Sequence, residues 1–163
     1  MHRRRLSRLL PLAVAAAFGL SGCSGSPAVQ AKIAPRASSA LCAKVATKWP
    51  KLVAKQQPRD TTAKSDTVRA WGDPAIVARC GVTSPGPTTD PCVNVDGVDW
   101  VGRPLSDGFA FVTFGRSPAI EVLIPTKYGA FDLAAFGPAV KVLPRGSSRC
   151  TAPSAQPNPT VQG

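Results

Sequence analysis

Alternating apolar and polar residues predict strands in the second half of the chain. Residues 93–95 alternate, the pair Asp96-Gly97 follows, and residues 98–100 alternate again. An Asp-Gly pair between two alternating segments is a strong signature of a β-hairpin. Alternation or an apolar run beside a turn predicts further strands over residues 75–82, 109–114 and 120–124. The pattern therefore indicates about five antiparallel strands.

A different period marks a helix that precedes these strands. Between residues 40 and 49 the apolar positions recur every fourth residue, with lysines between them, at Leu41, Val45 and Trp49. This spacing places them on one face of an amphipathic helix. Ser39 is expected to cap the first turn through its hydroxyl, and Pro50 is expected to end or kink the helix.

The last apolar stretch, residues 131–143, is predicted to be helical in pieces. Gly137-Pro138 interrupts it, and Pro138 is able to begin a short second helix because proline suits the first helical turn. Together these elements predict an α+β fold. It consists of a small antiparallel sheet with an N-terminal helix and a short C-terminal helix.

The first 22 residues have the features of a secretory signal. Four arginines among the first eight residues precede an apolar stretch, residues 9–20. That stretch is too short to span a bilayer, which needs about 20 residues. Leu20-Ser21-Gly22-Cys23 then resembles the bacterial lipobox, in which the cysteine sulfur is acylated before cleavage. We expect a lipidated Cys23; the alternative is an ordinary cleaved signal in which Cys23 is incidental.

The signal sets the expected domain organisation and location. Residues 1–22 are removed, residues 23–38 form a lipidated flexible tether, residues 39–150 form one α+β domain, and residues 151–163 form a disordered tail. Two or three acyl chains anchor a protein stably, since each buried methylene contributes about 0.8 kcal/mol. The expected location is therefore the outer face of the cytoplasmic membrane.

Charge is concentrated in the part of the chain nearest this anchor. The net charge is +11, but the signal contains four of the 20 basic residues and none of the nine acidic ones, which leaves +7. Residues 32–69 carry that whole excess, because their nine basic residues face only Asp60 and Asp66. Such a segment attracts anionic headgroups, and a solvated helix face explains it equally well. Nucleic acid is an unsuitable partner because an exported protein seldom meets it.

Cysteine usage agrees with export. Once Cys23 is lipidated, four cysteines remain: Cys42, Cys80, Cys92 and Cys150. An even number in an exported chain predicts two disulfides, with three possible pairings. None of the spacings is as short as the Cys-x2-Cys pair typical of zinc sites, so we expect no metal.

Catalytic side chains are scarce in the sequence. The single histidine, His2, leaves with the signal, which removes Ser-His-Asp and Cys-His chemistry from the mature chain. Glu121 is the sole glutamate, and its alternating strand predicts a solvent-facing position. We therefore expect no catalytic residues and no cofactor, and an enzyme that uses aspartates alone is the least favoured alternative.

A small set of residues has the character of a binding site. Trp71 and Trp100 are either core residues, which is the interpretation we favour, or the aromatic floor of a ligand site. In the second case Arg79 or Arg103 would lie at its edge, since Trp and Arg are common at binding hot spots. Asp73, in an expected turn before a proline, completes the set of possible binding residues.

Several short motifs together resemble a known family. They are residues 70–77 (Ala-Trp-Gly-Asp-Pro-Ala-Ile-Val), residues 79–82 (Arg-Cys-Gly-Val), Cys42, residues 95–100, Arg116-Ser117-Pro118 and residues 138–141. Over roughly residues 40–144 they resemble an uncharacterised actinobacterial lipoprotein family, which is catalogued as a domain of unknown function. The family implies no activity because none is established for it.

The resemblance also implies a disulfide pairing. The family pattern contains a cysteine in the first helix and one in the Arg-Cys-Gly-Val run, and Cys92 and Cys150 lie outside it. It therefore implies Cys42–Cys80 and Cys92–Cys150. The competing pairing joins Cys80 to Cys92, which flank one loop, and Cys42 to Cys150.

Two functions follow from these expectations. The first is a non-enzymatic envelope lipoprotein that binds a protein partner or supports an envelope complex. The second is a binding module for a lipid, a glycan or a small molecule. An apolar cavity between sheet and helices would favour the second function, and a solidly packed core would count against it.

Overall fold

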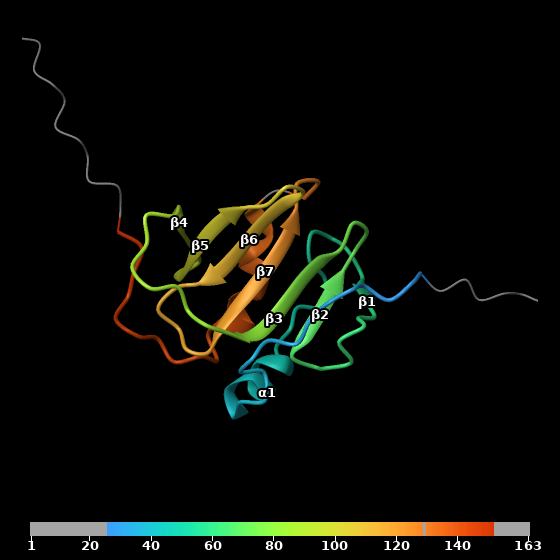
Figure 1. Ribbon diagram of the computed structural model, residues 1–163, viewed down its shortest axis with the longest axis horizontal. Coiled ribbons are helices and arrows are strands. Elements are labelled where there is room, and N and C mark those ends of the chain that lie inside the picture. The colour runs from blue at the N-terminus through green and yellow to red at the C-terminus, as the bar shows by residue number, and fades with distance from the viewer. Residues whose placement is uncertain (1–25, 129, 152–163) are drawn as a thin grey trace, which may run out of the picture.

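An antiparallel sheet organises the part of the chain that the structure, a computed structural model, describes: residues 26–128 and 130–151. Within these residues the sheet has seven strands in the order β1-β2-β3-β7-β6-β5-β4 (Figure 1). Each pair of neighbouring strands is antiparallel. The strands are β1 (Pro58–Arg59), β2 (Val68–Trp71), β3 (Ile76–Val82), β4 (Cys92–Val95), β5 (Val98–Pro104), β6 (Gly108–Thr113) and β7 (Ala119–Pro125).

The α+β class is as expected, but the predicted number of strands is wrong because the sheet also contains β1 and β2. β1 lies within residues 56–66, whose polar composition predicts a loop. It has only two residues, which pair with Trp71 and Ala70 of β2. The extended form of β1 therefore depends on its partner strand, and no alternation within β1 signals it.

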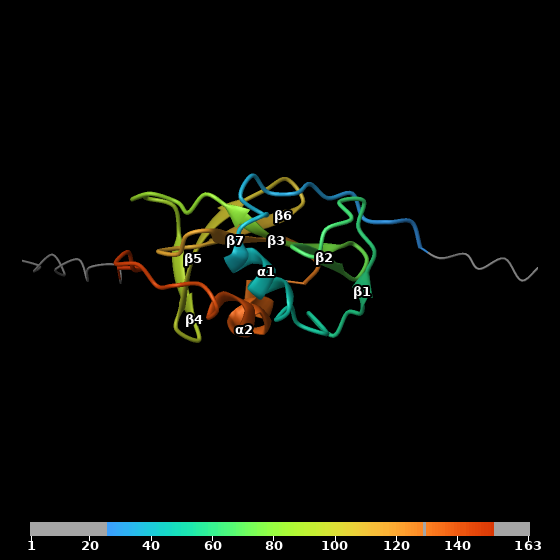
Figure 2. The same ribbon diagram turned by 90° about the horizontal axis from the view of Figure 1, so that it is seen from below.

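The two faces of the sheet are covered by different parts of the chain (Figure 2). Helices α1 (Ala40–Ala46) and α2 (Gly137–Val140) lie on one face, and residues 29–37, here called the N-terminal segment, cross the other. A short 3-10 helix, η1 (Ala130–Phe136), leads into α2. The largest fully buried side chains fill the space between the sheet and the helices: Trp71, Trp100, Phe136, Ile76, Ile120, Ile124, Leu133 and Leu143.

The N-terminal segment differs from the flexible tether expected over residues 23–38. The backbone nitrogen of Val29 donates to the carbonyl of Asp60 at 2.8 Å, and that of Arg36 donates to Gly81 at 3.0 Å. Ala34 and Ala37 are buried against the sheet. The tether expectation is therefore wrong for residues 29–37, because small residues suit close packing of backbone on a sheet as well as flexibility; residues 23–25 lie outside the described part.

Helix α1 begins as predicted and ends earlier. The hydroxyl of Ser39 accepts a hydrogen bond from the Cys42 nitrogen at 3.2 Å, which confirms the expected cap. The helix stops at Ala46 rather than continuing to Trp49. Tertiary contacts place Trp49 instead: its Nε1 donates to the Asp66 carbonyl at 2.9 Å, and its ring meets Phe136 edge-on.

Two disulfides join Cys42 to Cys80 and Cys92 to Cys150, the pairs that the family resemblance implies. The first connects α1 to β3 inside the core, where both cysteines are fully buried. The second connects β4 to the end of the described chain. The cross-linked residues are 38 and 58 positions apart, so each bond closes a long loop.

The remaining local predictions have clear outcomes. The hairpin is confirmed, since Asp96 and Gly97 connect β4 and β5 with φ angles of 50° and 79°, as a tight hairpin turn requires. Pro138 lies in the first turn of α2, as expected for the second C-terminal piece.

Neither residues 26–128 nor residues 130–151 include a helix with the length and apolar character needed to span a membrane.

Candidate functional site

Both tryptophans of the predicted binding set lie in the core. Trp71 is 1% exposed, packs edge-on against Phe136 with 5.6 Å between ring centroids, and donates through Nε1 to the Pro50 carbonyl at 3.2 Å. Trp100 is fully buried on β5, and its Nε1 has no hydrogen-bond partner among the described residues. The favoured core interpretation therefore holds, and the alternative, an aromatic floor for a ligand site, does not form.

The three charged members of the set are held apart in separate ion pairs. Asp73 is exposed in the β2–β3 turn and lies 3.7 Å from Arg59. On β3, Arg79 donates to its cross-strand neighbour Glu121 at 2.6 Å, on the face that the N-terminal segment crosses. Glu121 is thus half-buried in an ion pair rather than facing solvent, which corrects the expectation for its position.

Arg103, the last member of the set, forms an exposed pair at the end of β5. Its Nε donates to Asp90 at 2.7 Å. This hydrogen bond holds the pKa of Asp90 below 3.8, the ordinary value of that carboxyl. The five residues consequently do not converge on one site, since each is engaged in the core or in its own pair.

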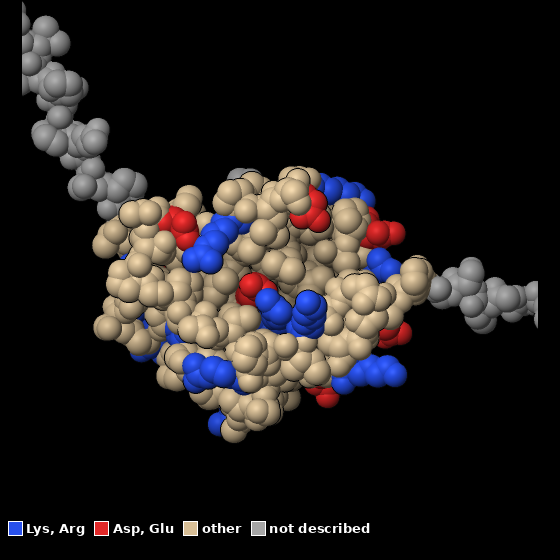
Figure 3. All heavy atoms as spheres, viewed as in Figure 1, with Lys and Arg blue, Asp and Glu red and all other residues tan. Residues whose placement is uncertain are grey.

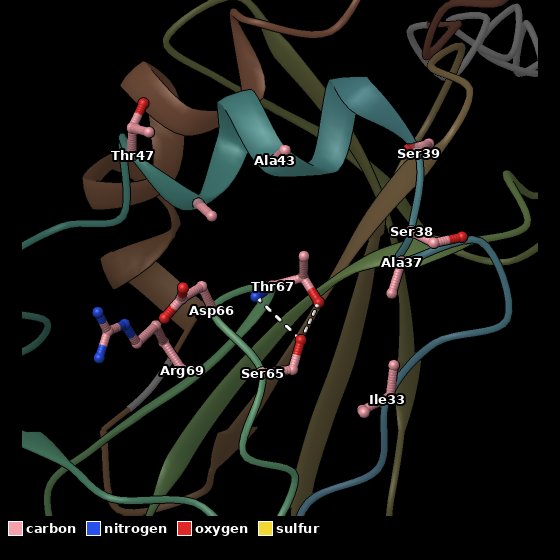
Figure 4. A pocket seen from close by; sticks show the side chains of 11 residues that line it. Ile33, Ala37, Ser38, Ser39, Ala43, Thr47, Ser65, Asp66, Thr67 and Arg69 are labelled. Atoms are coloured by element: carbon pink, nitrogen blue, oxygen red, sulfur yellow. Dashed lines mark hydrogen bonds between the residues drawn. The ribbon is translucent and has the colours of Figure 1, made fainter.

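A sizeable hollow on the surface lies instead beside α1 (Figure 4). It has a volume of about 700 Å³ and lies between the helix, the N-terminal segment and the residues that lead into β2. We call it the α1 groove. Its lining residues are Ile33, Ala37, Ser38, Ser39, Ala43, Ala46, Thr47, Ser65, Asp66, Thr67 and Arg69.

Hydroxyl groups dominate the polar lining of the α1 groove. The hydroxyls of Ser65 and Thr67 lie 2.8 Å apart and hydrogen-bond to each other, as Figure 4 shows. Ile33, which is 53% exposed, adds an apolar contact surface. The groove has no histidine or cysteine in its lining. It is suited to holding a polar ligand through hydrogen bonds, and it offers no pair of groups for nucleophilic chemistry.

The fold also brings together a group of charged residues that the sequence did not predict. Asp99 and Arg116 are both buried, and Asp99 accepts a hydrogen bond from Asn94 at 2.7 Å. Asp99 also lies 3.5 Å from Arg145, a residue near the chain end. Arg116 belongs to the Arg-Ser-Pro motif, which was the one local signal available. Arg116 and Arg145 lie opposite each other in an isolated antiparallel bridge, and nothing in the sequence indicates this pairing.

The fold and its surface define a small disulfide-linked α+β domain with a filled core and polar surface hollows. Comparison with known protein families then assigns the chain to one of them. It belongs to the family described as "Protein of unknown function (DUF3515)", whose pattern matches residues 7–147. No curated protein and no solved structure matches the chain.

Proposed function

We propose that this chain is a cell-envelope lipoprotein, anchored through Cys23 to the outer face of the cytoplasmic membrane, where it acts as a non-enzymatic binding or accessory protein. The Leu-Ser-Gly-Cys motif after a basic and apolar leader carries the proposal. Two disulfides suit such an extracytoplasmic location, because they persist in oxidising surroundings.

The short stretch of chain between Cys23 and the first contacts with the domain supports a close approach to the membrane. The Pro27 carbonyl accepts a hydrogen bond from Arg59 at 2.8 Å, and Val29, which bridges Thr61, lies six residues after Cys23. An extended chain spans at most about 3.6 Å per residue, so Val29 lies within about 22 Å of the lipidated cysteine. The domain therefore stays next to the bilayer rather than at the end of a long tether.

The basic residues near Val29 are the best candidates for contact with anionic lipid. Arg59, Lys64 and Arg69 line a shared surface hollow together with Ala28. The remaining basic side chains between residues 32 and 69 do not all lie beside this hollow. On the face in Figure 3 the Lys and Arg side chains are dispersed rather than gathered in one patch. Electrostatic attraction to lipid is thus a secondary, salt-sensitive contribution beside the acyl chains.

The filled core supports protein binding over capture of an apolar ligand. Trp71, Trp100 and Phe136 are at most 1% exposed and occupy the space between sheet and helices, where a lipid cavity would have to lie. The partner on this view is another protein of the envelope. A second candidate function, binding of a polar ligand such as a glycan, draws its support from the hydroxyl-rich α1 groove.

Fractionation of cells that produce the chain with and without Cys23→Ala tests the anchor. The parent protein should sediment with membranes and give an acylated N-terminal peptide that begins at Cys23, and the variant should leave the membrane fraction. An unmodified cysteine in a membrane-bound parent would contradict the anchor.

Crosslinking in intact cells tests the accessory role. Recovery of a protein partner, and its loss when exposed residues of this chain are substituted, would support the accessory role. Binding of soluble glycans that weakens in Ser65→Ala and Thr67→Ala would favour the second candidate.

A further inference from the structure

A second hollow lies where the β6–β7 turn meets residues 144–150. Its volume is about 410 Å³, within the range of about 300–1,000 Å³ that is typical of ligand sites. Arg116 and Ser117 of the turn line one side, and Arg145 lines another. The two segments touch through their backbones, since the Gly146 nitrogen donates to the Gly115 carbonyl at 2.7 Å. We call this site the arginine hollow.

Arg116 is a buried cation without a matching carboxylate. It is 7% exposed, and its Nη1 donates to the Leu143 carbonyl. None of the ion pairs among the described residues includes it. Buried charges in proteins are normally paired, because removing an ion from water is costly. The position of Arg116 is therefore unfavourable unless an anion approaches it.

Positive charge exceeds negative charge around this site. Arg116 and Arg145 both line the hollow and face each other in an antiparallel bridge, an arrangement that like charges disfavour. Burial lowers the pKa of Arg116, and the positive charges of Arg145 and Arg149 lower it further, against the opposing effect of Asp99. Arg36, outside the lining, reaches the same turn, since its Nη1 donates to the Ser117 hydroxyl at 2.9 Å. One carboxylate, that of Asp99, lies 3.5 Å from Arg145 and leaves the other arginines without an acidic partner in the hollow.

We propose that the arginine hollow binds a phosphoryl group. Guanidinium groups donate paired hydrogen bonds to phosphate oxygens, and several of them suit an anion whose oxygens point in several directions. A flat carboxylate with two oxygens is satisfied by one arginine. Ser117, Ser147 and Ser148 also line the hollow, and their hydroxyls can donate further hydrogen bonds. The volume leaves room for the organic part of a phosphorylated compound.

The segments that form the hollow lie at the opposite end of the domain from the start of the described chain. In Figure 1 the described chain begins on the right beside β1, and residues 141–151, coloured orange to red, lie on the left; Figure 2 agrees. The source of the phosphoryl group is therefore expected to be a soluble or wall-borne compound rather than a headgroup of the anchoring membrane. The binding chemistry itself does not depend on the anchor, so the two proposals can fail separately.

Calorimetry with the full-length chain carrying Cys23→Ser tests the site, with inorganic phosphate and glycerol 3-phosphate as probes. Sodium acetate at equal ionic strength serves as the control anion. Arg145→Gln should weaken phosphate binding at least about tenfold, which corresponds to about 1.4 kcal/mol. Arg145 is 47% exposed, but it also lies 3.5 Å from the buried Asp99, so a thermal melt checks that the variant is folded. Arg103→Gln is the matched control, because it removes one exposed arginine outside the hollow.

The outcomes separate the sources of the anion. Saturable phosphate binding that Arg145→Gln abolishes and Arg103→Gln preserves supports a soluble phosphoryl ligand. Binding only to phosphatidylcholine vesicles that contain phosphatidylglycerol, again lost in Arg145→Gln, supports a lipid headgroup. Equal binding of phosphate and acetate, or equal phosphate binding by the parent and Arg145→Gln, overturns the proposal.

Discussion

Gly81 in β3 leaves no room for a side chain beside Ala37: a Cβ atom at Gly81 would lie 2.4 Å from the Ala37 nitrogen. The Gly81 carbonyl accepts a hydrogen bond from the Arg36 nitrogen at 3.0 Å, and Gly81 has a φ angle of 111°. The close approach therefore explains the glycine of the Arg-Cys-Gly-Val run. It fixes the N-terminal segment on the sheet.

Gly81→Ala should destabilise the domain by about 2–4 kcal/mol, because the new methyl group meets backbone atoms and the positive φ angle adds strain. Urea unfolding of the parent and the variant measures the difference. Gly86→Ala is the matched control, since no atom lies within 4 Å of a Cβ at that position. Equal stability of Gly81→Ala and the parent would contradict the packing of the N-terminal segment.

The disulfide pairing can be read from a peptide map of the unreduced protein. We expect peptides that contain Cys42 with Cys80 and Cys92 with Cys150, and a Cys80–Cys92 peptide would contradict the fold. In the chain-entropy model, loops of 38 and 58 residues each contribute about 4 kcal/mol. Paired alanine variants should lose stability of that order.

The second disulfide should also affect the arginine hollow. Cys150 follows Arg149 directly, and its bond to Cys92 holds residues 144–150 against the domain. The Cys92→Ala/Cys150→Ala variant should therefore bind phosphate more weakly than the parent in calorimetry. The Cys42→Ala/Cys80→Ala variant, if still folded, should bind phosphate as the parent does, because neither cysteine lines the hollow or adjoins residues 144–148.

Replacing each core tryptophan by phenylalanine should have unequal effects. Both changes remove part of an indole ring from the core, but Trp71→Phe also leaves the partly buried Pro50 carbonyl without its donor. Trp100→Phe breaks no such bond among the described residues. We expect Trp71→Phe to cost about 1 kcal/mol more in the free energy of unfolding. Equal or reversed losses in urea unfolding would contradict the assigned hydrogen bond.

Arg103→Gln should raise the pKa of Asp90 towards 3.8, because the guanidinium hydrogen bond is what lowers it. The folded pKa is depressed, so the pair adds stability above the unfolded value of 3.8 and loses it as the pH falls through the folded value. The Arg103 side chain is 62% exposed and that of Asp90 is 35% exposed, so solvent screens the pair and the change in stability at neutral pH should be small. NMR titration of the Asp90 carboxyl measures the shift, and an unchanged pKa would disprove the pairing.

Short-range patterns determined the elements that depend on neighbouring residues. Asp96-Gly97 specified the β4–β5 turn because few residue pairs accept its left-handed backbone. Ser39 specified the start of α1 because its hydroxyl reaches a nitrogen only three residues away. The lipid anchor at Cys23, which lies outside the described residues, is likewise a local motif and stays a prediction.

Only the tertiary structure decided the contacts between distant segments. β1 exists because Ala70 and Trp71 offer it a partner, and the N-terminal segment is ordered because Val29 meets Asp60 and Arg36 meets Gly81. Arg116 and Arg145 come together in the same way, across 29 positions of the chain. Local periodicity does not indicate such pairings. The free energy that stabilises them arises from backbone and charge contacts that form only when the sheet has assembled.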